Sequence, residues 1–310
     1  MFKKILVTGA TGLLGHAVMA LAPEYPDTEF VGIGSRDCDL NRIDGTVAFV
    51  RSVSPDAIVH TAALAGGIQY SMQHPATLLR DNVLQNLAVL EAARLNGVRK
   101  TILTLSTGMY AADAPVPIKE EYIHDGPPHE SNYSYAFAKR LIEPSIRAYR
   151  TEYQLPVIGL VSNGIFGEFA NYRPAEAVMV ASLIRRFVEQ KASGEPIVIW
   201  GDGSPLREYT YSRDMARAFM WCLEHYDEAQ ILHVGSTEEH SVKDTALMIA
   251  DIVGIDRSRL QFDTTRPAGI LRKGTDNSKF VSRSGFKYTP FRDGLVKTIQ
   301  WYLDLSLIHI

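Results

Sequence analysis

Short apolar runs alternate with longer amphipathic stretches over the first half of the chain. The apolar runs predict strands at residues 4–8, 30–33, 57–60, 101–105 and 157–161. Between some of them, apolar residues recur at helical spacing and predict helices at residues 13–21, 77–95 and 135–153. Strands that alternate with helices favour a doubly wound α/β fold, in which helices cover both faces of a mostly parallel sheet.

The pattern becomes irregular after Asn163. Ser241 and Asp244 resemble a capping box that opens a helix ending at Val253. Further helices are predicted at residues 179–190 and 292–305, and a strand at 196–200. We expect a larger domain at residues 1–163 and 207–232, and a smaller C-terminal α/β domain at residues 164–206 and 233–310.

Composition excludes several classes of protein. With 310 residues, 46% of them hydrophobic and 22% charged, the chain can bury a sizeable core. A net charge of −3 indicates neither a nucleic-acid surface nor a polybasic membrane patch, and no apolar stretch approaches membrane-spanning length. Two cysteines, Cys38 and Cys222, indicate no disulfide framework. Without a signal-peptide pattern, we expect a cytoplasmic protein.

Three glycines follow the first predicted strand and open the first predicted helix. They are Gly9, Gly12 and Gly15 in the run Thr-Gly-Ala-Thr-Gly-Leu-Leu-Gly. Glycines allow a tight turn and let the backbone approach a pyrophosphate, which the amides of a helix N-terminus then bind. A purely structural turn is the alternative. The position predicts a Rossmann-type dinucleotide site.

The second strand is followed by Gly34-Ser-Arg36. A carboxylate at that strand end would favour NAD, because it would bond the ribose 2′-hydroxyl. Arg36 is instead placed to pair with a 2′-phosphate through its fork of donors, which predicts NADP(H). A surface arginine without a ligand is the alternative. Asp39 and Leu40 are expected on the adenine side of the cofactor.

Tyr135 and Lys139 lie four residues apart on a predicted helix, so their side chains share one face. Ser106 ends the fourth strand, at the edge where doubly wound sheets bind ligands. We expect the ammonium of Lys139 to lower the pKa of Tyr135, which would then protonate a ketone oxygen held by Ser106 while the nicotinamide delivers hydride. An ordinary amphipathic pair is the alternative for the tyrosine and lysine.

These motifs resemble the short-chain dehydrogenase/reductases of the extended type, and several segments resemble the GDP-L-fucose synthase group within them. The segments are Ala62–Gly67, Ile123–His129, Phe166–Asn171, Trp200–Gly203, Arg207–Tyr211 and Phe262–Thr265. The resemblance implies a GDP-linked 4-keto sugar as substrate and a homodimer through two long helices. It also implies that Lys139 holds the nicotinamide ribose.

The resemblance, taken with the glycine motif, assigns two sets of binding residues. The expected cofactor contacts are Gly9, Thr11, Gly12, Leu13, Leu14, Gly15, Arg36, Asp39, Leu40, Leu105 and Lys139. The expected substrate contacts are Arg186, Trp200, Arg207 and Lys273. Two alternatives remain open here, since Trp200 could belong to the core and the neighbouring Arg185 could be the ligand in place of Arg186.

The chain departs from the group where the group carries its epimerase residues. The group's cysteine, two residues after the strand-end serine, is Gly108 here, and its histidine is Val178. Neither side chain can move a proton. An asparagine of the group is replaced by Gly164 and a substrate-contacting aspartate by Ala268. We therefore expect an NADPH-dependent 4-ketoreductase without epimerase chemistry, acting on a GDP-4-keto-deoxyhexose or a GDP-4-keto-heptose.

Three other functions remain open. A bifunctional epimerase/reductase would need another acid/base group, such as Glu176 or Tyr110. A redox-neutral NAD epimerase is disfavoured by Arg36. A nucleotide-sensing regulator on the same fold is disfavoured by the Tyr135 and Lys139 pair. No metal-site spacing is visible, since His124 and His129 lie in a loop rich in proline and glycine and His16 is expected to pack or face solvent.

Overall fold

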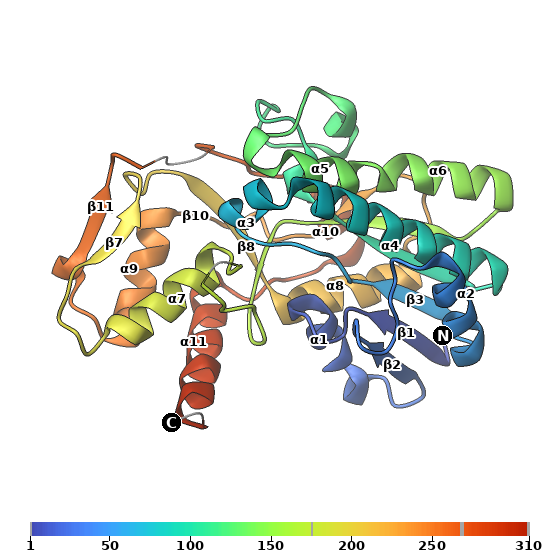
Figure 1. Cartoon of the computed structure of the whole chain (residues 1–310), viewed down its shortest axis with the longest axis horizontal. Coiled ribbons are helices and arrows are strands. Elements are labelled where there is room, and N and C mark those ends of the chain that lie inside the picture. The colour runs from blue at the N-terminus through green and yellow to red at the C-terminus, as the bar shows by residue number, and fades with distance from the viewer. Residues whose placement is uncertain (1, 175, 267–269, 309–310) are drawn as a thin grey trace.

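The computed structural model describes residues 2–174, 176–266 and 270–308. Its main sheet has six parallel strands in the order β2-β1-β3-β4-β5-β9 (Figure 1). The strands are β1 (Lys4–Thr8), β2 (Glu29–Ile33), β3 (Ala57–His60), β4 (Lys100–Ser106), β5 (Val157–Ser162) and β9 (Leu232–His233). The strand order reverses beside β1, and ligands of such sheets bind at the carboxyl ends of the strands near that point.

Helices cover both faces of this sheet, as the alternating pattern predicts. Ile5 and Val7 of β1 pack in a core with the helices α1 (Leu13–Met19) and α8 (Ser212–His225). Leu6 points to the opposite face and packs in a second core. That core is formed with α2 (Ile43–Val53), α4 (Pro75–Leu95) and α6 (Ile142–Tyr153). The doubly wound α/β fold is confirmed.

Some predicted helix boundaries were wrong. The single helix expected at residues 135–153 is two helices, α5 (Tyr133–Arg140) and α6, separated at Leu141. Pro144 explains the break, because it has no N–H to donate to the carbonyl of Arg140. The helices α2 and α8 and the strand β8 (Leu206–Tyr211) were not predicted at all.

A smaller part of the molecule lies to one side of the main sheet, on the left in Figure 1. Strand β8 lies between β10 (Glu239–Ser241) and β6 (Gly164–Phe166), and β7 (Ile197–Trp200) pairs with β11 (Leu260–Asp263). A third core joins these strands to α7 (Met179–Gln190), α9 (Val242–Val253) and α11 (Phe291–Ile308). At the start of α9, Ser241 Oγ accepts a hydrogen bond of 2.9 Å from Asp244 N, so the predicted cap is present.

The remaining helices are short. They are α3 (Ile68–Gln73), α10 (Ser278–Ser284) and 3-10 turns at Ala22–Glu24, Thr107–Met109, Glu120–His124, Glu130–Asn132 and Arg257–Arg259. Within the described residues, no helix has both the length and the apolar character needed to cross a bilayer.

Candidate active site

The turn after β1 can be built only with glycine at two positions. Gly9 has a φ of +70°, in the left-handed region. A Cβ at Gly15 would lie 2.1 Å from the carbonyl oxygen of Gly9. Gly12 is the N-cap of α1 and provides no side chain to cap it, so first-turn amides remain available for phosphate oxygens. This turn fits a dinucleotide pyrophosphate.

The other expected cofactor contacts lie around the same edge. Thr11 is exposed, whereas the side chains of Leu14, Leu40 and Leu105 are buried in the sheet–helix cores. Contact with a bound cofactor at those three leucines would therefore be made through the backbone. The Asp39 side chain accepts a hydrogen bond of 3.0 Å from Asn41 N.

Arg36 is exposed just beyond the end of β2, and no carboxylate of the described residues lies within 4 Å of it. A carboxylate does stand next to it in the sequence, at Asp37. Its Oδ2 accepts a hydrogen bond of 2.8 Å from Gly34 N, which holds it against its own turn. At the end of β2, the described residues therefore provide Arg36 with no carboxylate partner, whereas Asp37 is engaged by its own turn.

The structure brings Ser106, Tyr135 and Lys139 together at the carboxyl end of β4. Ser106 lies close enough to Tyr135 to lower the pKa of its phenol, and Ser106 Oγ accepts a hydrogen bond of 3.2 Å from Gly108 N. Lys139 Nζ donates to the carbonyl of Thr104 at 2.8 Å and lies 5.8 Å from the centre of the Tyr135 ring.

The expectation that the ammonium of Lys139 lowers the pKa of Tyr135 was wrong. Burial raises the pKa of Tyr135 to about 12, although the nearby Ser106 side chain acts in the opposite direction. Lys139 does not compensate, because its ammonium is directed at the Thr104 carbonyl, and burial lowers its own pKa to about 8. Tyr135 is therefore protonated near neutral pH, which is the form that can donate a proton.

Gly108 lies inside this constellation. A Cβ built on it would be 3.4 Å from Ser106 Oγ, so any side chain at this position would approach the reacting centre. Val178 is the N-cap of α7 and is 46% exposed. The segment before it is anchored near the site, because the carbonyl of Glu176 accepts a hydrogen bond of 3.2 Å from Gly67 N in the loop after β3.

The two substitute acid/base groups differ in their surroundings. Tyr110 is fully buried, and its hydroxyl hydrogen-bonds His233 Nε2 at 2.6 Å. Burial raises the pKa of Tyr110, and this together with its bond to His233 disfavours it as an epimerase base. Glu176 is half-buried and hydrogen-bonds Asn171 at 2.7 Å, which leaves it as a candidate. Ala268, where the group has an aspartate, lies outside the described residues.

Two of the expected substrate cations lie close enough to affect each other's charge. Burial and the positive charges of Arg207 and Arg140 lower the pKa of Lys273 to about 8. Arg207 Nη1 donates to the carbonyls of Leu206 and Ile270, each at 2.7 Å. In the described part of the chain, no carboxylate lies within 4 Å of these basic groups, so an anion from outside would meet uncompensated charge.

Glu208 and Thr275 hold this cationic region together. The buried carboxylate of Glu208 accepts hydrogen bonds of 2.7 Å from both the N–H and the hydroxyl of Thr275, which fixes the segment after Lys273 beside β8. The segment is also paired with Ile118, which donates to the carbonyl of Gly274 at 2.8 Å and accepts from Asp276 N at 2.8 Å.

The other two expected substrate residues lie at β7: Trp200 ends this strand, and Arg186 reaches it from α7. Trp200 is 62% exposed, so the alternative that it belongs to the core was wrong. Arg186 donates to the carbonyl of Val198, two residues before Trp200. Its neighbour Arg185 forms an ion pair of 2.7 Å with Glu189. Arg186 is thus the better placed of the two arginines for an external anion.

Sequence analysis missed Arg140 and Glu208. Arg140 is buried and donates to the carbonyls of Met109 at 2.9 Å and Gly126 at 2.8 Å, so it ties the segment after Ser106 to α5. The one feature of the sequence that could have pointed to Arg140 was its position directly after Lys139. Glu208 gave no local signal, because Thr275 lies 67 positions away.

The three histidines noted in the sequence contact other side chains or the backbone nearby. His16 stacks on Phe169 with 3.4 Å between ring centres, and His124 pairs with Glu143 at 2.9 Å. His129 accepts a hydrogen bond of 3.3 Å from Ser131 N. Among the described residues, no group of three or more histidine, cysteine, aspartate or glutamate side chains could hold a metal ion.

Known proteins share both the sequence pattern and the fold. The model of the NAD dependent epimerase/dehydratase family matches residues 5–235. The GDP-L-fucose synthase of Dictyostelium discoideum is 32% identical over 97% of this chain and 96% of its own. A GDP-L-fucose synthetase from Naegleria fowleri bound to NADP superposes with a TM-score of 0.92 at 31% identity, covering 98% of this chain and 94% of that one. MlghC, a GDP-mannoheptose C4 reductase from Campylobacter jejuni with NADP bound, gives a TM-score of 0.87 at 25% identity, covering 97% and 98%.

Proposed function

We propose that this chain, which belongs to the NAD dependent epimerase/dehydratase family, is an NADPH-dependent reductase of the 4-keto group of a GDP-linked deoxyhexose or heptose. The observation that carries the proposal is the meeting of Ser106, Tyr135 and Lys139 beside Gly108, a position without a side chain. The similarity to a GDP-L-fucose synthase and to a GDP-mannoheptose C4 reductase supports the substrate class.

The three side chains divide the work of the reduction. Bound NADPH would supply the hydride to the ketone carbon. Ser106 Oγ orients the ketone oxygen, and Tyr135 donates its proton to that oxygen as negative charge develops there. The raised pKa of Tyr135 keeps this proton in place until a strongly basic alkoxide forms. Lys139 Nζ lies 5.8 Å from the centre of the Tyr135 ring and would bind the cofactor ribose.

Two separate sets of residues would hold the two ligands. The glycine turn after β1 and Arg36 would bind the pyrophosphate and the 2′-phosphate of NADPH. Arg207, Lys273 and Arg186 would bind the diphosphate of the substrate, since they lack carboxylate partners among the described residues. The exposed ring of Trp200 would cover the guanine or the sugar.

A bifunctional epimerase/reductase is the second candidate. Its support is the 32% identity to a GDP-L-fucose synthase over nearly the whole length of both chains. Moving a proton at the carbons beside a ketone needs an acid/base group within hydrogen-bond reach of them. Gly108 provides none, and Val178 is apolar, so Glu176 would have to serve.

One reaction separates the two candidates. GDP-4-keto-6-deoxymannose and a GDP-4-keto-heptose are each incubated with the enzyme and NADPH in D₂O, and the products are read by NMR and mass spectrometry. We expect NADPH oxidation and a reduced C4 with at least one substrate, and no enzyme-dependent deuterium at C3 or C5. Deuterium at either carbon, above a control without enzyme, would favour the bifunctional reading. Absence of NADPH oxidation with both substrates would exclude the reductase.

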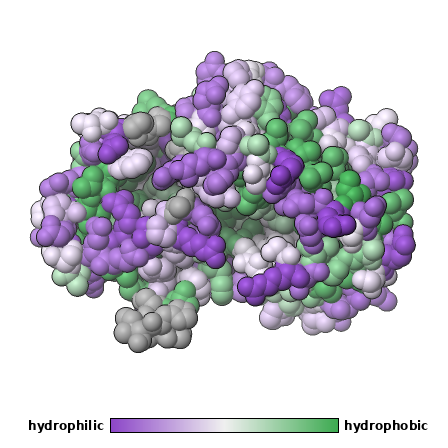
Figure 2. All heavy atoms as spheres, in the orientation of Figure 1, coloured by the Kyte–Doolittle hydropathy of each residue, from purple (hydrophilic) through white to green (hydrophobic). Residues whose placement is uncertain are grey.

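The assembly is also a proposal. Apolar residues gather over α4 and α6 on the face seen in Figure 2, and the exposed ones include Leu79, Leu95 and Leu141. Two copies that pair these helices would bury them, which supports a homodimer. Sedimentation of the wild type and of Leu95→Glu would test it, since the charge should shift the protein toward monomer.

A further inference from the structure

Asn132 occupies the N-cap position of α5 but does not cap the helix. Asparagine is among the strongest N-cap residues, because its side-chain oxygen accepts an amide of the first turn. Here the side chain makes no such bond. Ser241 at the start of α9 does cap its helix, with a bond of 2.9 Å. The carboxamide of Asn132 thus leaves the first-turn amides of α5 uncapped, although asparagine commonly caps them.

The carboxamide instead lies at the centre of the candidate site. A Cβ built on Gly108 would be 3.1 Å from Asn132 Nδ2 and 3.4 Å from Ser106 Oγ, so the glycine leaves a space bounded by these two polar groups. Asn132 is half-buried, and no described residue hydrogen-bonds its carboxamide. The amide donor of Asn132 and the hydroxyl of Ser106 therefore border this space, and Asn132 stands three residues before Tyr135.

We propose that Asn132 binds the C3 hydroxyl of the 4-keto sugar, in the space that Gly108 leaves open. The inference rests on the proposed function. Ser106 and Tyr135 hold the oxygen on C4, and the two ring neighbours of C4 are C3 and C5. C5 carries the ring oxygen, so the hydroxyl of C3 is the only one on a carbon adjacent to the ketone. Asn132 makes this chain selective for substrates that keep that hydroxyl.

The test compares Asn132→Ser with the wild type on GDP-4-keto-6-deoxymannose and on the analogue that lacks the C3 hydroxyl. Serine is a good N-cap but is too short to reach the sugar. The wild type prefers the hydroxylated substrate in kcat/KM by roughly 5- to 100-fold, the usual range for leaving one buried hydrogen-bonding group unpaired. In Asn132→Ser this preference falls to within a factor of about two to three, and NADPH binding and the melting temperature are unchanged.

Ser241→Ala is the matched control. It removes the side chain of an N-cap that the helix does use, at a distance in the chain from the reacting residues. It lowers the melting temperature by about 2 °C and leaves the substrate preference intact. A merely structural role for Asn132 would make its variant behave in the same way.

Two failures are distinguishable. If the wild type reduces both substrates with equal efficiency, or if Asn132→Ser keeps the wild-type preference, the inference is overturned and the reductase stands. If the wild type oxidises NADPH with neither substrate nor with a GDP-4-keto-heptose, the proposed function fails and the inference falls with it.

Discussion

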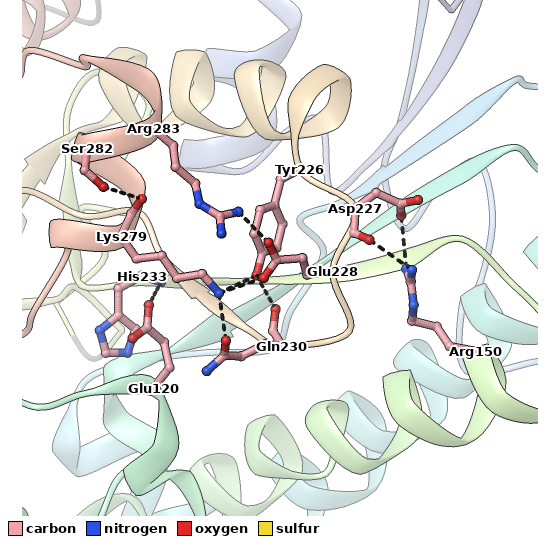
Figure 3. A network of polar contacts seen from close by, with 10 residues as sticks. All are labelled: Glu120, Arg150, Tyr226, Asp227, Glu228, Gln230, His233, Lys279, Ser282 and Arg283. Atoms are coloured by element: carbon pink, nitrogen blue, oxygen red, sulfur yellow. Dashed lines mark hydrogen bonds and ion pairs between the residues drawn. The ribbon is translucent and has the colours of Figure 1, made fainter.

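Two groups of basic side chains in this molecule have opposite surroundings. In the Glu228 cluster, formed by Glu228, Lys279, Arg283 and Tyr226, the cations converge on one carboxylate (Figure 3). Lys279 Nζ lies 2.9 Å and Arg283 Nη1 2.5 Å from its oxygens, and their hydrogen bonds lower the pKa of Glu228 to about 2. At the candidate active site, the described residues provide Lys139, Arg207 and Lys273 with no carboxylate within 4 Å.

The difference separates charges used for folding from charges kept for ligands. The Glu228 cluster joins α10 to the loop after α8, and each of its cations pairs with the carboxylate of Glu228. Among the described residues, Lys139 and Arg207 donate to backbone carbonyls, and burial lowers the pKa of both Lys139 and Lys273 to about 8. Leaving buried cations unpaired costs stability, and an anionic cofactor and an anionic substrate would restore it on binding.

The largest expected effect concerns the proton donor. Tyr135→Phe removes the hydroxyl beside Ser106 and should lower kcat by about 10²- to 10⁴-fold, the usual contribution of a positioned general acid. The NADPH dissociation constant, measured by fluorescence titration, should stay within a factor of about two, because the ring that packs the site remains. Activity close to wild type would mean that the proton comes from elsewhere.

Exchanging one cation from each group tests the comparison directly. Lys273→Met should raise KM for the GDP-sugar by roughly 10- to 100-fold, since a charge-assisted bond to the diphosphate is lost. It should leave the melting temperature unchanged or higher, because a buried unpaired ammonium is removed. Lys279→Met should do the reverse, lowering the melting temperature and leaving KM alone. If both variants changed KM and the melting temperature in the same way, the two groups of cations would not differ in role.

Arg36 should decide the choice of cofactor. The wild type should prefer NADPH over NADH in kcat/KM, and Arg36→Ala should lose roughly 10- to 150-fold with NADPH through the missing contact to the 2′-phosphate. Efficiency with NADH should change little. A wild type that prefers NADH would show that Arg36, although it has no carboxylate within 4 Å among the described residues, is only a surface residue.

The smallest effect belongs to the Glu228 cluster and depends on pH. Because the folded-state pKa of Glu228 is lowered from 4.5 to about 2, its stabilisation is present above pH 4.5 and is lost as the pH falls toward 2. The side chain is 40% exposed, so solvent screening limits the contribution to about 1 kcal/mol, or roughly 2 °C in melting temperature. Glu228→Gln should melt lower than wild type at pH 7, and the gap should close in acid. Asp27→Asn, on an exposed carboxylate without an ion pair among the described residues, should change neither.

Most of the large domain could be predicted because its signals are local. Residues 4–8 and 57–60 are mostly apolar, and such runs become central strands wherever helices cover both faces. Strand β8 was missed because its sequence, Leu-Arg-Glu-Tyr-Thr-Tyr, has little apolar alternation. It becomes a strand through its pairing with β6 and β10, which lie far away in the chain.

The candidate site also contains residues that local sequence predicts and residues that only long-range contacts bring together. The glycine spacing and the four-residue step from Tyr135 to Lys139 act within one turn or helix, so the sequence could place them side by side. The meeting of Arg207 with Lys273 depends on Glu208 and Thr275, which only the folded chain brings together. The direction of the Tyr135 pKa was mispredicted for a related reason, since burial is a property of the whole fold.

The hydrogen bonds that join Gly274 and Asp276 to Ile118 have a consequence for how the protein is made. The glycine turn, Arg36 and Tyr135 lie in the first half of the chain, but the core beneath the glycine turn also includes α8, so the nucleotide side of a growing polypeptide is complete only once α8 has emerged from the ribosome. The substrate side closes later, after residue 276 has emerged, because the segment that carries Lys273 is held by hydrogen bonds to Ile118 that cross more than half of the sequence. A nascent chain would therefore complete its coenzyme side before it could recognise a sugar.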